Sequence, residues 1–146
     1  MFKKFFKKKE QNKSNNENIL VIALLIHAAK IDENYSEAEK KIIKTTIMRL
    51  CETNFTETEK LFKLAEKKEA ESNQIVEFTK EIKKHSLEFR LKIIEIIWQI
   101  VYSDGNSDNY ESNLIRRVCG LLYVSDKDNG IIKTKVKNSQ NKLWHT

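Results

Sequence analysis

The sequence contains no proline, only three glycines and only two cysteines among its 146 residues. An all-β fold needs many tight turns, which glycine and proline commonly form. Their scarcity therefore favours an all-α fold. A chain of this length suits one domain, and it can bury enough surface to form a core without disulfides or a structural metal.

Recognisable catalytic and zinc-binding motifs are also missing. Cys51 and Cys119 lie far apart in apolar segments, and no Cys-x-x-Cys pair or Cys/His cluster is present. We expect two buried thiols in a reducing compartment. None of the three histidines forms a recognisable arrangement with a serine or cysteine, and there is no glycine-rich phosphate loop. The sequence thus predicts a protein that is not an enzyme.

The net charge of +6 is unevenly distributed along the chain. Residues 1–13 carry +5 and residues 133–146 carry +4, whereas residues 14–132 carry −3. A nucleic-acid-binding domain places its basic residues on a folded face, often as arginines, and only four arginines are present. We therefore expect no nucleic-acid partner. No signal peptide is visible, and the longest apolar run, Ile19–Ile26, is too short to span a bilayer, so we expect a cytoplasmic protein.

The N-terminal segment places Phe2, Phe5 and Phe6 at helical spacing among lysines. Two interpretations stay open. The segment makes weak contact with an anionic membrane surface through residues 1–13, at about 1 kcal/mol per nearby lysine, or it is a solvated chain end. Residues 10–18 are polar and indicate a flexible linker. We therefore divide the chain into a basic flexible segment (1–16), a helical domain (17–140) and a tail (141–146).

From Asn18 onward, apolar residues recur at helical spacing. This pattern predicts a bundle of about seven helices over residues 18–31, 37–52, 57–70, 73–84, 87–103, 109–123 and 126–138. The expected N-caps are Ser36, Thr56, Ser72, Ser86, Asp108 and Ser125. The third helix has few apolar residues and is expected on the outside, burying Leu61, Phe62, Leu64 and Ala65. The first and fifth helices are apolar nearly all round and are expected at the centre.

The two apolar helices are followed by similar acidic turns, which indicates an internal helix–loop–helix duplication. A shift of 72 positions superposes Asp32 on Asp104, Ser36 on Asp108, Glu39 on Glu111, Ile43 on Ile115, Ile47 on Cys119 and Leu50 on Leu122. The same shift places His27 on Gln99. We expect His27 to be a core histidine with a hydrogen-bonding partner, and Glu95 and Gln99 to face solvent or a neighbouring helix.

The second acidic turn, Asp-Gly-x-x-Asp-x-x-Glu at Asp104–Glu111, resembles the motif of the TerB-like (tellurite-resistance-associated) domain. A weaker copy lies at Asp32–Glu39, where Glu33 replaces the glycine. The stretch Leu87–Asp128 is similar to bacterial single-domain TerB-like proteins and to the N-terminal part of membrane-anchored DnaJ-type co-chaperones. The resemblance covers about residues 17–140. It implies an all-helical bundle with an acidic cation site.

The carboxylates of these turns have a structural interpretation. Ser36 with Glu39, and Asp108 with Glu111, have the spacing of capping boxes, in which each partner bonds the other's backbone amide. Asp32 and Asp104 follow apolar helices, and the helix dipole disfavours a negative charge at that end by about 0.3–1 kcal/mol. Each aspartate therefore needs a positive partner, which is a lysine, backbone amides of the next helix, or a cation.

The functional interpretation is that four carboxylates, Asp32, Glu39, Asp104 and Glu111, converge near the two-fold axis of the duplication. An all-oxygen ligand set suits Ca²⁺, Mg²⁺ or Mn²⁺. An EF-hand is excluded, because a loop starting at Asp104 has Asn109 and Ile115 where glycine and glutamate are required. Two functions remain: a cation-binding module of metal or oxyanion stress, or a co-chaperone-like scaffold that binds an unknown protein partner without metal.

Overall fold

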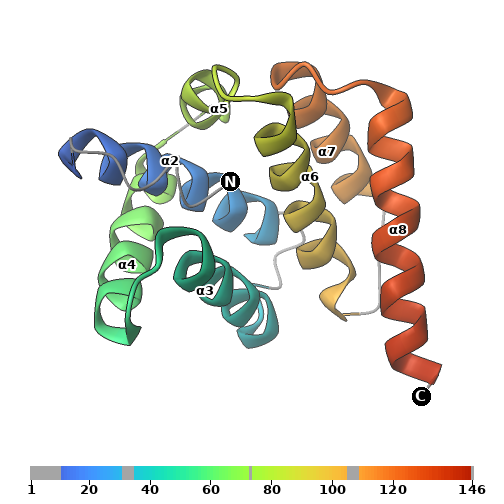
Figure 1. The fold of residues 1–146 in the computed structure, drawn as a ribbon, viewed down its shortest axis with the longest axis horizontal. Coiled ribbons are helices and arrows are strands. Elements are labelled where there is room, and N and C mark those ends of the chain that lie inside the picture. The colour runs from blue at the N-terminus through green and yellow to red at the C-terminus, as the bar shows by residue number, and fades with distance from the viewer. Residues whose placement is uncertain (1–10, 31–34, 73, 105–108, 146) are drawn as a thin grey trace.

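The computed structural model describes the backbone of residues 11–30, 35–72, 74–104 and 109–145, and their side chains except those of 11–16, 104, 109–112 and 140–145. Within these ranges the fold is all-α and contains no strand, as expected (Figure 1). The helices are α2 (Gln11–Lys30), α3 (Glu37–Cys51), α4 (Phe55–Glu71), α5 (Val76–Ile82), α6 (Leu87–Val101), the 3₁₀ helix η1 (Tyr102–Asp104), α7 (Asn109–Leu121) and α8 (Asp126–His145).

The two apolar helices form the centre of the bundle. α2 and α6 contact each other, and they lie between α4 and α8 in Figure 1. In α2 the consecutive residues from Val21 to Ile26 are all at most 3% exposed. In α6 the indole of Trp98 is buried and donates a hydrogen bond to Asn129 Oδ1 at 2.9 Å, which ties α6 to α8. The prediction of two central helices is therefore confirmed.

The duplication extends over three helices in each half. α2, α3 and α4 correspond to α6, α7 and α8, and the central helices pack most extensively against α4 and α8 respectively. The pairs aligned by the 72-residue shift are buried in both halves: Ile43 with Ile115, Ile47 with Cys119, and Leu50 with Leu122. α5 connects the halves.

The turns after α3 and α7 are also equivalent, at a shift of 71 positions. Glu52 (φ 53°) and Tyr123 (φ 57°) are the non-glycine residues with left-handed backbone in the described part of the chain. Two residues further on, Asn54 and Ser125 cap the next helix: their side chains accept hydrogen bonds from the amides of Glu57 and Asp128. The two repeats therefore align at a shift of 72 up to the end of α3 and at a shift of 71 from these turns onward, including α4 with α8.

Several predicted boundaries are wrong. α2 begins at Gln11 instead of residue 18, so residues 11–17 of the expected linker are helical. α4 is capped by Asn54 instead of Thr56. α5 starts after Ile75, which makes no side-chain cap, while Ser72 closes α4. α6 ends at Val101 and continues as η1, and α8 runs to His145 instead of residue 138.

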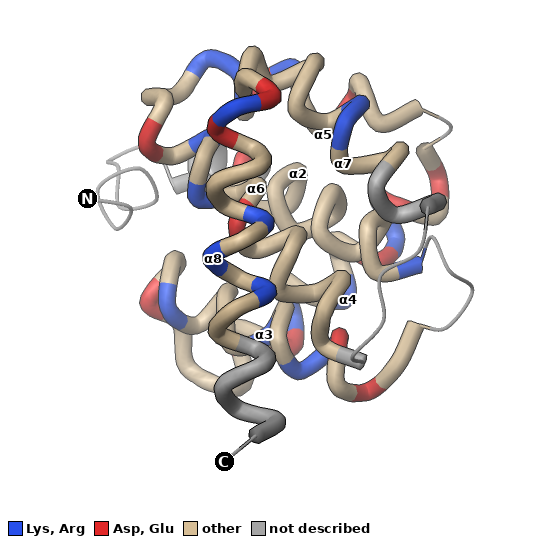
Figure 2. The backbone as a smooth tube through the Cα atoms, turned by 90° about the vertical axis from the view of Figure 1, so that its right-hand side faces the viewer, with Lys and Arg blue, Asp and Glu red and all other residues tan. Residues whose placement is uncertain are grey.

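α4 lies at the edge of the molecule in Figure 1, as expected for its few apolar residues. It buries Phe62 and Ala65 against α2, but Leu61 is only half-buried and Leu64 is 44% exposed. It also buries two polar residues, Thr58 and Glu69. On the other side of the molecule, α8 lies in front of α6 and carries lysines along its length (Figure 2). None of the described helices is both long enough and apolar enough to cross a membrane.

Candidate functional site

The first acidic turn leads into a capping box at the start of α3. The amide and hydroxyl of Ser36 donate hydrogen bonds to Glu39 Oε1 at 2.9 and 3.1 Å, and Ser36 Oγ accepts one from the Glu39 amide at 3.1 Å. Glu39 is only 2% exposed. The structural interpretation of this carboxylate is therefore confirmed: it stabilises the N-terminus of α3 without any ligand.

The other three carboxylates predicted as cation ligands are located only in part. Asp32 lies outside the described residues, as does the expected cap Asp108. The backbone of Asp104 ends η1 and that of Glu111 is in the first turn of α7, but their side chains are not among those described. η1 packs against both α6 and α3. The element that carries Asp104 thus lies beside the helix that carries Glu39.

Glu69 of α4 joins α4 to the end of α2. Its carboxylate accepts a hydrogen bond from Lys30 Nζ at 2.7 Å, and its second oxygen lies 3.1 Å from His27 Nδ1. Burial raises the pKa of Glu69, but the hydrogen bonds and charges of Lys30 and His27 outweigh it and hold the pKa below its usual value of 4.5. His27 thus has the partner expected for it, but its side chain is 32% exposed, so it is not a core residue.

Tyr35 connects the same network to the first acidic turn. Its hydroxyl donates to Glu66 Oε2 at 3.1 Å, and the ammonium of Lys40 lies 4.7 Å from the centre of its ring. Burial, and then the charges of Glu66, Glu69 and Glu39, raise the pKa of Tyr35 far above its usual value. The phenol therefore stays protonated and acts as a hydrogen-bond donor among carboxylates. The sequence pattern gives no signal for Glu66 or Glu69, because both lie among many other charged residues of α4.

No set of three or more histidine, cysteine, aspartate or glutamate side chains in the described ranges is arranged to hold a metal ion. A shared cation site therefore requires Asp32, Asp104 or Glu111 in addition to Glu39. The two thiols offer no alternative, because burial raises the pKa of both Cys51 and Cys119 to about 12. Both thiols are therefore protonated at neutral pH. Cys119 is buried as expected, whereas Cys51 is only half-buried.

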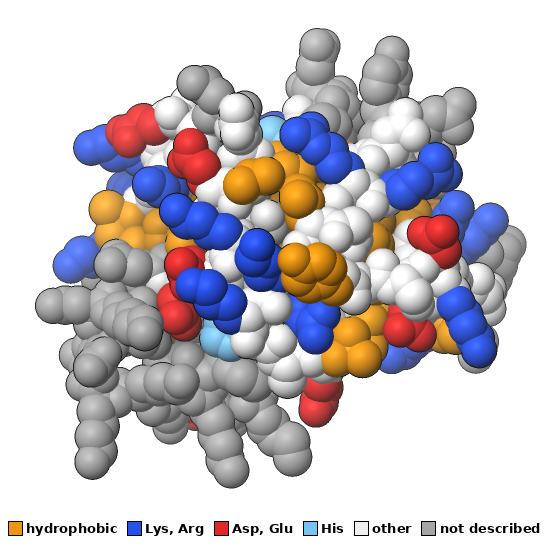
Figure 3. Space-filling model, turned by 90° about the horizontal axis from the view of Figure 1, so that it is seen from above, with side chains coloured by type: hydrophobic (Ala, Val, Ile, Leu, Met, Phe, Trp, Pro, Cys, Tyr) orange, Lys and Arg blue, Asp and Glu red, His pale blue; other side chains and the backbone are white. Residues whose placement is uncertain are grey.

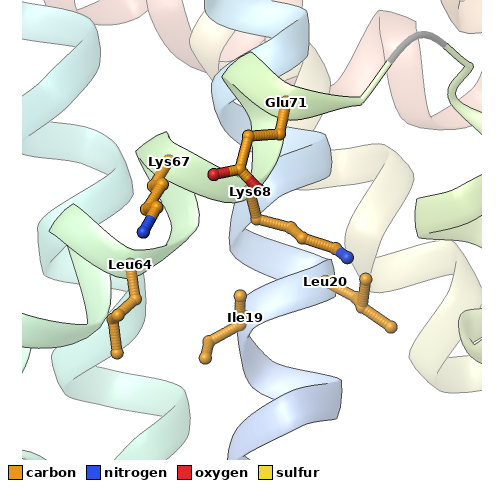
Figure 4. A pocket seen from close by; sticks show the side chains of 6 residues that line it. All are labelled: Ile19, Leu20, Leu64, Lys67, Lys68 and Glu71. Atoms are coloured by element: carbon orange, nitrogen blue, oxygen red, sulfur yellow. The ribbon is translucent and has the colours of Figure 1, made fainter.

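Exposed hydrophobic side chains are spread over the surface. On the face shown in Figure 3 they form separate patches between lysine and arginine side chains. In the described part of the chain the large exposed ones are Met48, Phe55, Leu64, Val76, Leu87, Tyr123 and Ile131. Leu64 lies in a groove between α2 and α4 (Figure 4), and Met48 and Phe55 line a second groove between α3 and α4.

The comparison with protein families gives a match that agrees with this architecture. The family model of the tellurite resistance protein TerB matches residues 18–134. No curated protein and no solved structure matches the chain. The matched region runs from the first buried turn of α2 into α8 and so includes both repeats and both acidic turns. Because this match covers most of the sequence, the chain belongs to the TerB family of tellurite resistance proteins.

Proposed function

We propose that this TerB-family module binds one divalent cation between its two acidic turns, through Asp32, Glu39, Asp104 and Glu111. It thereby serves in the response to metal or oxyanion stress, in the cytoplasm and without catalysing a reaction. The observation that carries this proposal is the packing of η1 against α3. This packing brings the helix end with Asp104 beside the helix that carries Glu39 in its first turn.

The electrostatics of the turns support the same proposal. Asp104 ends a helical segment, where the helix dipole disfavours a carboxylate. The equivalent Asp32 comes two positions after Lys30, the last residue of α2. A cation bound between the turns would neutralise both aspartate charges, and the oxygen ligands suit Ca²⁺, Mg²⁺ or Mn²⁺. The capping role of Glu39 is compatible with this, since carboxylates can accept several partners.

Calorimetric titration tests the cation. The wild-type protein is titrated with Mg²⁺, Ca²⁺ and Mn²⁺, beside the variants Asp32→Asn and Asp104→Asn. One ion per chain is expected, and each variant should weaken binding at least about tenfold, because each removes one charged ligand. Glu57→Gln is the matched control, because Glu57 belongs to the capping box of α4, which follows the opposite end of α3 from Glu39. Absence of binding at millimolar concentrations of all three ions contradicts the proposal.

A second candidate function is an interaction module of the co-chaperone type. The observation that favours it is the α2/α4 groove, which leaves apolar side chains accessible at the surface. In this function the acidic turns are only helix caps, and the basic residues 1–13 recruit the protein to an anionic membrane. Co-sedimentation with anionic vesicles tests the recruitment. Deletion of residues 1–13 should abolish it, and unchanged lipid binding would exclude this anchor.

A further inference from the structure

The α2/α4 groove has an apolar floor and a charged rim. It is lined by Ile19 and Leu20 of α2 and by Leu64, Lys67, Lys68 and Glu71 of α4 (Figure 4). Ile19 and Leu20 are half-buried, whereas Leu64 is 44% exposed. Exposed leucine side chains gain little from folding, so the core does not explain why Leu64 is apolar.

The second repeat shows what the fold accepts at the same positions. At the shift of 72 positions that relates α2 to α6, Leu20 corresponds to Lys92 and Ala23 to Glu95. At the shift of 71 that relates α4 to α8, Leu64 corresponds to Lys135. There the glutamate lies 3.6 Å from each of the two lysines and joins α6 to α8 by ion pairs. The duplicated fold therefore tolerates charged side chains at these positions. The third floor residue, Ile19, corresponds to the apolar Leu91, so only the pair Leu20 and Leu64 is apolar in the first repeat alone. This pair indicates a role other than packing.

The rim carries positive charges that the fold leaves unpaired. Lys30 pairs with Glu69 and Lys44 with Glu59, whereas neither Lys67 nor Lys68 makes an ion pair within the described part of the chain. The exposed face of α4 adds Lys60 and Lys63. A ligand of this groove is therefore expected to combine aliphatic side chains with negative charges.

We propose that the α2/α4 groove binds an acidic amphipathic helix of a partner protein. Its aliphatic side chains, spaced i, i+3, i+4 and i+7, lie on Ile19, Leu20 and Leu64, and its carboxylates face Lys67 and Lys68. The chain's own N-terminal segment is a poor occupant, because its lysines meet like charges at the rim. A flat bilayer engages protruding side chains better than this recessed floor. The inference rests on the interaction-module function and gives it a surface and a partner chemistry.

The test uses a synthetic helical peptide with leucines on one face and glutamates on the other. Backbone amide spectra of the full chain are recorded during titration with this peptide, with a lysine-for-glutamate version and with anionic vesicles. We expect the acidic peptide to shift the amides of residues 19–20 and 64–71, and added salt to weaken its binding. The basic peptide and the vesicles should leave these amides unchanged.

The variants Leu20→Lys and Leu64→Lys copy side chains of the second repeat, so they are expected to fold. Each variant should weaken binding of the acidic peptide roughly tenfold or more, because it places a charge against apolar side chains. Leu87→Lys is the matched control: Leu87 is 45% exposed, almost as much as Leu64, but it lies at the start of α6. This control should bind the peptide as the wild type does.

The possible failures are distinguishable. Peptide-induced shifts outside the groove, unaffected by Leu64→Lys, overturn the groove while leaving the interaction function standing. Absence of any shift with the acidic peptide contradicts the proposal that the groove binds an acidic helix. It also removes the support that the groove gives to the interaction-module function. If the amides of the groove shift with vesicles but not with the peptide, the groove binds lipid and the proposal of a helical partner is wrong. None of these results affects cation binding at the acidic turns, which is measured separately.

Discussion

Glu39 shows how one carboxylate carries both the structural and the functional interpretation. Ser36 donates two hydrogen bonds to it, and it is almost completely buried. Buried carboxylates are rare unless they are paired or hydrogen-bonded, and this cap supplies the partners that the fold requires. Any cation at this position therefore uses a ligand that the helix already holds in place.

The capping box predicts a stability effect that does not depend on metal. Ser36→Ala in chelator-containing buffer should lower the free energy of unfolding by about 1 kcal/mol, because it removes the side-chain cap from the Glu39 amide. Urea unfolding measures this effect. Asn54→Ala, in the capping box of α4, is the control and should have a similar effect. A loss in Asn54→Ala alone would show that Ser36 does not stabilise α3.

Glu69 predicts a pH dependence of stability. Its pKa in the folded protein is below the unfolded value of 4.5, so its contribution is present above about pH 4.5 and is lost as pH falls below it. Unfolding by urea at several pH values should show that the free energy of unfolding falls more steeply toward acid pH for the wild type than for Glu69→Gln. The exposed Glu71→Gln, on the same helix, should retain the wild-type slope. Equal slopes for all three proteins would contradict the Lys30–Glu69 interaction as the cause.

At the scale of elements, the two left-handed turns are the clearest mark of the duplication. A non-glycine residue in this conformation costs about 1–2 kcal/mol, and both repeats accept that cost at the equivalent residues Glu52 and Tyr123. The carbonyls of Leu122 and Tyr123 accept hydrogen bonds from the Arg90 guanidinium at 2.8 and 3.5 Å, which fixes the second turn against α6. The turn geometry is therefore set by the tertiary structure.

This geometry predicts opposite effects of two substitutions at Tyr123, a residue whose side chain is 69% exposed. Tyr123→Gly should raise the free energy of unfolding by up to about 1 kcal/mol, since glycine adopts a positive φ without strain. Tyr123→Val should lower it, because a β-branched residue is strained there. Thermal and urea unfolding of both variants give the comparison. Destabilisation by glycine as large as that by valine would rule out backbone strain as the cause.

The sequence predicts the helices better than their ends. Around the start of α4, Asn54 with Glu57 and Thr56 with Glu59 both have capping-box spacing, so local sequence cannot choose between them. The structure selects Asn54, because Thr58 is buried and its hydroxyl lies 2.7 Å from that of Thr53. Ser72 donates a hydrogen bond to Glu77 but does not cap α5, since burial of Ile75 and Phe78 sets where that helix begins.

The candidate site is less predictable for the same reason. The capping role of Glu39 follows from spacing within one helix, and the sequence predicts it correctly. Glu69 lies more than one helix away from Lys30 and His27, so its role depends on how α4 packs against α2. A carboxylate on a mostly charged helix gives no periodic signal of burial. Only the preference of buried charges for paired partners, applied to His27, pointed toward such a residue.

At the scale of the whole molecule, the duplication has kept the core and changed the surface. Ile43, Ile47 and Leu50 of α3 have buried counterparts in or directly after α7, whereas the α2/α4 and α6/α8 faces differ in charge and polarity. Both halves also share the acidic turn in sequence, and η1, which ends at Asp104, packs against α3, which carries Glu39. The central claim is therefore that the two acidic turns bind one cation together.

Amide spectra recorded during titration with Mn²⁺ test this claim most directly, because paramagnetic broadening falls steeply with distance. A shared cation site predicts that amides flanking both turns, at Tyr35 and Ser36 and at Ser103 and Asn109, broaden together at the same Mn²⁺ concentration. The amide of Leu87, about 20 Å from the end of α6, should stay sharp. Broadening at one turn alone, or at neither, would contradict a shared cation site and leave the carboxylates as separate helix caps.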